Sequence, residues 1–172
     1  MEHIGYTPAS IPLTRGMVAI VDAADMPFLT QWSWYAVPAS DGSTFYAARS
    51  HIRADGEKRQ LRMHNALMTP AQGLTVDHID RDGLNNRRSN LRLANHRQNM
   101  ANRRFKPGCS GFRGVHKWGK RWSANVSVDG KPTVVAVCDT ALEAALAYDA
   151  AARTAYGAFA VLNFPEPAND PA

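Results

Sequence analysis

The feature that most constrains the fold is a stretch of about thirty residues, 74–103, in which the character of the sequence changes three times. Residues 74–79, LTVDHI, and residues 90–94, NLRLA, have the apolar and β-branched composition that favours strands. The polar sequence DRDGLNNRRS lies between them and predicts a long loop. Asn95 can then cap a helix that runs to about residue 103. The predicted order is strand, loop, strand and helix.

Basic residues are concentrated in and after this stretch. Residues 81–121 hold twelve Lys and Arg but only one acid, Asp82, so that they carry +11 while the rest of the chain carries −6. Such segregation is the electrostatic footprint of a protein that binds a phosphate backbone. The alternative, a solvated basic face on an ordinary enzyme, is the weaker interpretation.

The composition argues against membrane and disulfide-rich classes. No apolar run approaches the roughly 18–20 residues of a membrane span, and the N-terminus lacks the pattern of a signal peptide. We therefore expect a soluble, cytoplasmic protein with no membrane partner. Cys109 and Cys138 are isolated, so neither a disulfide framework nor a cysteine zinc site is expected.

The remaining sequence divides by composition, and an α+β fold is expected. The N-terminal region should be β-rich, with strands at 17–22, 32–37 and 44–52, and the two tryptophans of the second should pack inside. A short helix is predicted at His64–Met68. The expected parts are the β-rich region 1–62, a strand–strand–helix core 63–104, a linker 105–111, a C-terminal domain 112–165 and a flexible tail 166–172.

The C-terminal domain should contain three strands followed by a helix. The strands are expected at 112–118, 121–128 and 132–137, and Thr140 with Glu143 forms a capping box for the helix. The helix is rich in alanine, which lets it lie close against a sheet. The residues expected to face it are Val126, Val128, Val135 and Val137.

Within 76–99, two adjacent residues can supply the chemistry of phosphodiester hydrolysis. This reaction needs a base for water and a cation for the charge that develops on the phosphate. Asp77 offers an oxygen ligand for a magnesium-like ion, and His78 offers a base with an unperturbed pKa near neutrality. Adjacent strand residues point to opposite faces, so they share a site only if the strand end bends or the site wraps its edge.

Asp77-His78, Asn90 within NNRRSNLR and Asn99 within HRQN resemble the HNH endonuclease motif, in its phage and intron-encoded homing branch. The resemblance implies a ββα-metal fold and cleavage of double-stranded DNA with one divalent ion. By this resemblance His78 is the general base, Asp77 and Asn99 hold the ion, and Asn90 pins the loop so that a hydrogen bond orients His78. Mg²⁺ is favoured and Mn²⁺ is the alternative, while zinc and small-molecule cofactors are not expected.

Several assignments in this region stay open. A shift of the helix register would bring Asn95 or His96 to the metal in place of Asn99. His78 could instead be a core histidine. His64, which matches the histidine of a Leu-His-Arg signature of the family, could support the site from behind, contact phosphate or be a buried structural residue.

Residues 110–165 resemble an AP2 domain, which is found beside HNH nucleases in phage. The resemblance rests on Arg113-Gly114-Val115, Trp122, NVSV, Ala144–Tyr148 with Asp149, and Asn163-Phe164-Pro165. It implies a three-stranded sheet that lies in the DNA major groove and is backed by the helix. Trp122 could equally be core. The residues expected on the DNA-facing side are Arg113, His116, Lys117, Trp118, Lys120, Arg121 and Trp122.

Together these features predict a monomeric HNH homing-type endonuclease, which acts on DNA and is targeted by a C-terminal AP2 module. Its origin could be a phage. The competing hypotheses are a non-catalytic DNA-binding regulator and an RNA-directed or structural nucleic-acid binder. Arginines around the motif are expected to grip DNA: Arg87, Arg88, Arg92, Arg97, Arg103 and Arg104.

Overall fold

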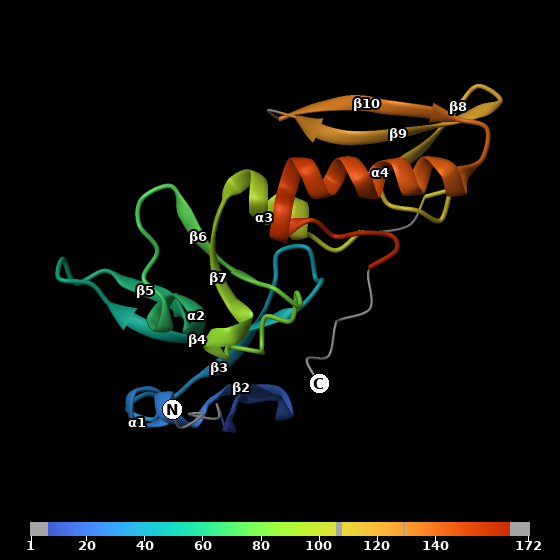
Figure 1. Cartoon of the computed structure of the whole chain (residues 1–172). Helices are drawn as coiled ribbons and strands as arrows, with labels where there is room; N and C mark the ends of the chain where they lie inside the picture. Colours follow the sequence, from blue (N-terminus) through green and yellow to red (C-terminus); the bar gives the residue numbers. More distant parts are fainter. Residues whose placement is uncertain (1–6, 106–107, 129, 166–172) are drawn as a thin grey trace, which may run out of the picture. The chain divides into compact units, whose positions relative to one another are not determined.

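The computed structural model describes residues 7–105, 108–128 and 130–165 of the chain (Figure 1). The tail expected at 166–172 and part of the linker expected at 105–111 lie outside these residues. The fold is α+β, with several small antiparallel sheets. The chain divides into two compact units, residues 1–96 and 97–172, and each is described by itself.

The first unit contains three small antiparallel sheets. The sheets are β1 (Pro8–Pro12) with β2 (Val18–Asp22), the order β3 (Tyr35–Pro38), β4 (Phe45–Ile52) and β5 (Lys58–Arg62), and the pair β6 (Leu74–His78) and β7 (Leu91–Asn95). Two short helices, α1 (Met26–Leu29) and α2 (Met63–Leu67), connect them. The expected strand, loop, strand and helix order at 74–103 is confirmed, with α3 at His96–Asn102.

Two details of the N-terminal region differ from expectation. The strand predicted at 32–37 begins only at Tyr35, because the preceding Trp34 turns into the core and donates from Nε1 to the carbonyl of Leu29 at 2.8 Å. The strand β1 was not predicted at all. Its sequence, PASIP, begins and ends with proline, which is tolerated on an edge strand such as this one.

One hydrophobic core joins the N-terminal sheets to the hairpin of β6 and β7. Val21 and Trp34 come from the N-terminal region, Met63 from α2, and Val76 and Leu91 from the hairpin, and all are buried in the same cluster. The N-terminal residues therefore form part of the body that carries the β6–β7 loop.

The second unit contains a three-stranded antiparallel sheet packed on a long helix. The sheet order is β10 (Lys131–Cys138), β9 (Arg121–Val128) and β8 (Val115–Trp118), and the helix is α4 (Ala141–Tyr156). Thr140 and Glu143 form the predicted capping box. The alanines of α4 meet the sheet as expected, since Ala144, Ala145 and Ala152 are fully buried. None of the helices in the described part of the chain is long and apolar enough to cross a lipid bilayer.

The face that β10 turns toward α4 is not the predicted one. Val126 is buried in the core as expected, but Val135 is 40% exposed, and the β10 residues that pack on the core are Ala136 and Cys138. The cause is an irregularity in the register between Val134 and Ala136, which shifts the alternation by one residue. Val128, at the end of β9, is also exposed.

Candidate active site and nucleic-acid interface

Asn90 ties together the two ends of the β6–β7 loop. Its Nδ2 donates to Asp80 Oδ1 at 2.9 Å and to the carbonyl of Asn85 at 2.8 Å, while its Oδ1 accepts from the Asp80 amide at 3.1 Å. Its own carbonyl accepts from the amide of Ile79. The buried side chain of Asn90 thus binds both the backbone and the side chain of Asp80 and the backbone of Asn85. These bonds fix the path of the loop immediately after His78.

Asp80 is a second centre of the loop that the sequence did not single out. It accepts from the Asp82 amide, from Asn85 Nδ2 at 2.6 Å and from Asn90. Burial opposes its ionisation, but these hydrogen bonds and the nearby His78 outweigh burial and hold the pKa of Asp80 below its usual value. The carboxylate is therefore ionised and engaged within the loop.

His78 ends β6 and is buried at 6% exposure. Its Nε2 lies 3.4 Å from Asn86 Oδ1. The amide nitrogen of Asn86 donates to the carbonyls of Leu84 and Gly83, so the oxygen of this amide is the atom that faces the imidazole. An oxygen acceptor beside Nε2 favours the tautomer in which Nε2 carries the proton and Nδ1 carries the lone pair.

Asn86 is itself held by the N-terminal region. It is completely buried, and its backbone amide donates to the carbonyl of Ile20 in β2 at 2.7 Å. The amide of Ile20 in turn donates to the carbonyl of Leu84 at 2.9 Å. The loop thus pairs with the edge of β2, a contact between segments more than sixty residues apart that no local pattern could reveal.

His64 lies directly behind His78. The two rings are 4.9 Å apart and nearly perpendicular, and the ring of Tyr46 lies 5.5 Å from His64 and 5.9 Å from His78. Nδ1 of His64 is buried without a hydrogen-bond partner. His64 is thus a buried residue in ring contact with His78.

Burial keeps both histidines neutral. Burial is the largest influence on the pKa of His78 and lowers it, whereas the hydrogen bond that His78 makes to Asn86 and the charges of Asp80, Asp77 and Asp82 raise it. The pKa of His64 falls to about 3, by burial first and then by the charges of His78 and Arg62. A neutral imidazole is the form that can accept a proton.

Asp77 lies opposite Arg92 in the hairpin, whereas His78 lies opposite Leu91. The Nε of Arg92 is 2.9 Å from Asp77 Oδ2, and the two side chains are 16% and 7% exposed. Arg92, which the sequence assigns to DNA, thus forms a buried ion pair with the expected metal ligand. Asp77 and His78 therefore point to opposite faces of the hairpin, as adjacent strand residues do, and β6 ends at His78.

Asn99 lies in α3 within the second unit, so its position relative to Asp77 is not described. The chemistry of the two donors fits Mg²⁺ or Mn²⁺, since a carboxylate and an amide oxygen are the ligands that such hard ions prefer. Within residues 7–105, 108–128 and 130–165, no three His, Cys, Asp or Glu side chains gather as a metal-binding group.

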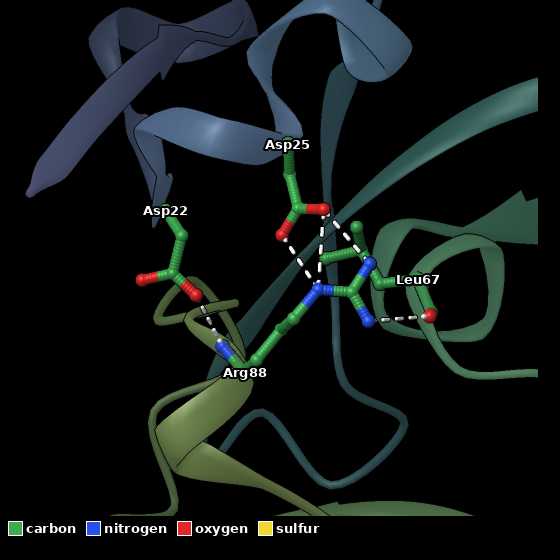
Figure 2. Close-up of polar contacts among 4 residues, drawn as sticks. All are labelled: Asp22, Asp25, Leu67 and Arg88. Atoms are coloured by element: carbon green, nitrogen blue, oxygen red, sulfur yellow. Dashed lines mark hydrogen bonds and ion pairs between the residues drawn. The ribbon is translucent and has the colours of Figure 1, made fainter. Parts of the chain in front are cut away.

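Arg88 anchors the loop to the N-terminal region, as Figure 2 shows. Its guanidinium makes an ion pair with Asp25 at 2.8 Å and contacts the carbonyl of Leu67, while its backbone amide donates to Asp22 Oδ2 at 2.9 Å. Asp22 and Asp25 are both buried. The side chain of Arg88, which the sequence assigns to DNA, is therefore engaged in a tertiary contact.

Several other predicted DNA contacts are also engaged within the protein. Arg113 donates to Tyr148 and to the carbonyls of Arg103 and Ala101, and Arg121 pairs with Asp139 at 2.7 Å. Two more of these arginines also contact protein atoms: Arg87 donates to Asn85, and Arg97 contacts the carbonyl of Ser127. Arg103 and Arg104 are exposed.

The residues that carried the C-terminal resemblance form an interior network. Asp149, only 2% exposed, accepts from the amides of Asn163 and Phe164. Asn163 in turn exchanges hydrogen bonds with the backbone of Arg113. Gly114 has φ +71°, and a Cβ there would lie 2.1 Å from the ring of Tyr148, so only glycine fits.

The predicted DNA-facing residues of this sheet divide between its two faces. Lys117 lies opposite Trp122, with its ammonium 4.2 Å from the indole, and Trp122 packs on the core, so this pair shares the face that meets α4. The expectation of a single polar face is therefore wrong, because strand alternation separates neighbours. The exposed residues at the other positions are His116, Trp118, Lys120 and Arg121.

Comparison with known proteins bears on the segment that carries the four motif residues and on most of the chain. A model of the HNH endonuclease family matches residues 68–101, which include Asp77, His78, Asn90 and Asn99. The chain is also similar to a protein of Acanthamoeba polyphaga mimivirus named "Uncharacterized HNH endonuclease L560". The two are 26% identical over 156 residues, which cover 87% of this chain and 76% of the viral protein.

Proposed function

We propose that the chain cleaves double-stranded DNA by divalent-metal-dependent hydrolysis, as a monomer of the homing type, because a model of the HNH endonuclease family matches residues 68–101. The observation that carries the proposal is the geometry of His78, a buried neutral histidine whose Nε2 faces Asn86 Oδ1.

In this mechanism His78 accepts the proton of the attacking water at Nδ1. His78 keeps its Nε2 proton and donates it in a hydrogen bond to Asn86 Oδ1, which aligns the ring, and Asn90 holds the loop that carries Asn86. The low pKa of His78 keeps the acceptor nitrogen unprotonated near neutral pH. His64 and Tyr46 pack against the ring and limit its rotation.

Asp77 and Asn99 would hold the divalent ion, with Mg²⁺ favoured and Mn²⁺ as the alternative. When bound, such an ion neutralises charge on the phosphate and the leaving oxygen. Arg92 already lies against Asp77 Oδ2, so it orients this carboxylate in the protein itself. Two protein ligands form a weak site on their own, and we expect phosphate oxygens of the substrate to complete it.

Cleavage of plasmid DNA tests this proposal. Wild type with Mg²⁺ or Mn²⁺ should nick or linearise the plasmid, chelator should stop the reaction, and His78→Ala should lower the rate by at least about a hundredfold. His51→Ala is the matched control, because His51 is an exposed histidine of β4. Equal rates for the two variants would rule out the role of His78, and binding without cleavage by wild type would favour the non-catalytic regulator.

We further propose that the second unit targets the nuclease to DNA as an AP2-like module. Support comes from the three-stranded sheet packed on α4 and from exposed Trp118 and Lys120 at the β8–β9 turn. A tethered second binder raises the affinity of a compact nuclease. Trp118→Ala and Lys120→Gln should weaken binding to duplex DNA without changing the melting temperature, and unchanged affinity in both would contradict this targeting role.

A further inference from the structure

The β4–β5 hairpin, the part of the first unit that projects beyond α2 in Figure 1, has two distinct faces. Its register pairs Ala48 with Arg62, Ser50 with Gln60, and Ile52 with Lys58. Residues paired across antiparallel strands point to the same side, and every second residue shares it. One face of the hairpin therefore carries Arg62, Gln60 and Lys58 in a row along β5.

The opposite face carries Arg49, Leu61, His51 and Arg59. Its cations are already engaged, because Arg59 pairs with Glu57 at 3.0 Å and the guanidinium of Arg49 stacks 4.2 Å from the ring of Trp32. At the hairpin tip Arg53 lies 3.9 Å from Asp55 and 4.0 Å from Glu57. The acidic residues of the hairpin thus neutralise cations at the tip and on the face that carries Arg59.

The row along β5 lacks such compensation. Among the described residues, neither Arg62 nor Lys58 makes an ion pair, and the guanidinium of Arg62 lies 4.4 Å from the ring of Tyr46. Lys58 and Gln60 are exposed. This face therefore carries two cations without an ion-pair partner, which can attract an anion.

This row begins beside the catalytic histidine. Tyr46, which carries Arg62 on its ring, is also in ring contact with His78 at 5.9 Å and with His64 at 5.5 Å. From Arg62 to Lys58 the strand extends about 13 Å, at roughly 3.3 Å for each residue. That length corresponds to about four nucleotides of duplex, at roughly 3.4 Å of axis for each.

We propose that Arg62, Gln60 and Lys58 form a phosphate-binding row that grips the backbone of duplex DNA next to the bond that His78 cleaves. This assigns DNA contact to the N-terminal region, and it rests on the proposed function for the nature of the substrate. Such contacts recognise phosphates and carry no base information, so they hold the duplex in register without selecting its sequence.

Salt dependence of DNA binding tests the row by loss of charge. Binding of a duplex oligonucleotide is measured by fluorescence anisotropy over a range of KCl, with chelator present so that no cleavage occurs. Lys58→Gln should reduce the slope of log Kd against log salt by about 0.9, and Lys58→Gln with Arg62→Gln by about 1.8. Arg59→Gln, which removes the same charge from the opposite face, should leave the slope unchanged.

A gain of charge completes the design. Ile52 lies opposite Lys58 and is 68% exposed, so Ile52→Lys adds a cation to the row without disturbing the core. It should steepen the slope by about 0.9, whereas His51→Lys on the other face should not. Circular dichroism checks that all variants fold.

The possible failures are distinguishable. Equal slopes for Lys58→Gln and Arg59→Gln, with wild type binding and cleaving duplex DNA, would overturn the row and leave the proposed function intact. Wild type that binds single-stranded RNA but no duplex would overturn both. Steepening by His51→Lys as much as by Ile52→Lys would show that total charge matters and not this face, which also overturns the row.

Discussion

At the residue scale, the proposed mechanism depends on which ring nitrogen of His78 accepts a proton. Asn86 decides this, since its oxygen faces Nε2 and its nitrogen is committed to the carbonyls of Leu84 and Gly83. The motif includes His78 and Asn90 but not Asn86. The only sequence signal is that Asn86 belongs to the LNNRR stretch of a motif-rich loop.

Replacing Asn86 with alanine tests its positioning role. We expect the single-turnover cleavage rate to fall about ten- to a hundredfold, as for other residues that orient a reactive side chain. The free energy of unfolding should also fall, by about 1–3 kcal/mol, because buried groups lose their partners. A variant that is destabilised but cleaves at the wild-type rate when fully folded would show that Asn86 is structural only.

The buried His64 makes stability depend on pH. Its pKa is about 3 in the folded protein and 6.5 in the unfolded chain. Below pH 6.5 the unfolded chain therefore binds a proton that the folded chain does not bind. The stabilisation is complete above pH 6.5 and is lost as the pH falls toward 3. At pH 5.5 the loss from His64 alone should be about 1.4 kcal/mol.

Urea denaturation of wild type and of His64→Phe at pH 7.5 and 5.5 measures this loss. Phenylalanine keeps the ring packing against Tyr46 and His78 but cannot titrate. The variant should therefore lose less stability between the two pH values than wild type does. Identical losses in both proteins would show that His64 is not the group responsible.

At the element scale, the β6–β7 loop is shaped by elements far away in the chain. The edge of β2 pairs with Leu84 and Asn86, and the turn at Ala23–Asp25 receives Arg88. Gly83 shows how close this packing is, because a Cβ there would lie 2.5 Å from the ring of Tyr46 in β4. The loop conformation therefore needs the N-terminal sheets as a scaffold.

Replacement of Arg88 by alanine separates its scaffold role from DNA binding. The loss of its charged hydrogen bonds to Asp25 should lower the free energy of unfolding by about 1–3 kcal/mol. The salt slope of DNA binding should stay unchanged, because Asp25 already neutralises this guanidinium. Asp25→Asn should cause a comparable loss, and the double variant should cost less than the sum. A reduced salt slope in Arg88→Ala would instead support direct DNA contact.

At the scale of the whole molecule, the two units have separate hydrophobic cores, one around Val21 and Val76 and the other around Val126 and Ala144. This separation predicts that damage to one core leaves the other intact. Gly114 offers a specific perturbation, since it contacts Tyr148 within the second core alone.

We expect Gly114→Ala to destabilise the second unit by about 3 kcal/mol, from overpacking against Tyr148 and from strain at positive φ. Differential scanning calorimetry should show one transition shifted to lower temperature and another unchanged. Gly119→Ala is the control for strain alone, because it also has positive φ but no atom within 4 Å. A single transition that shifts as a whole would contradict independent units.

The sequence by itself determined most of the elements and pointed to a nuclease family, because both depend on local patterns. Alternation and turn residues were enough to predict the β6–β7 hairpin with the helix after it, and the capping box predicted the start of α4. The pair Asp77-His78 with Asn90 and Asn99 led to the HNH family, which the match at 68–101 supports.

Only the tertiary structure decided which side chains meet. Arg88 and Arg92 are arginines in a basic stretch, and nothing local distinguishes an arginine that binds a buried aspartate from one that binds phosphate. The register irregularity in β10 exchanged the inner and outer residues of a strand whose location was predicted correctly. The contacts of Asn86 with β2 and of Arg62 with Tyr46 join segments distant in sequence, and such contacts are set by packing around a shared core.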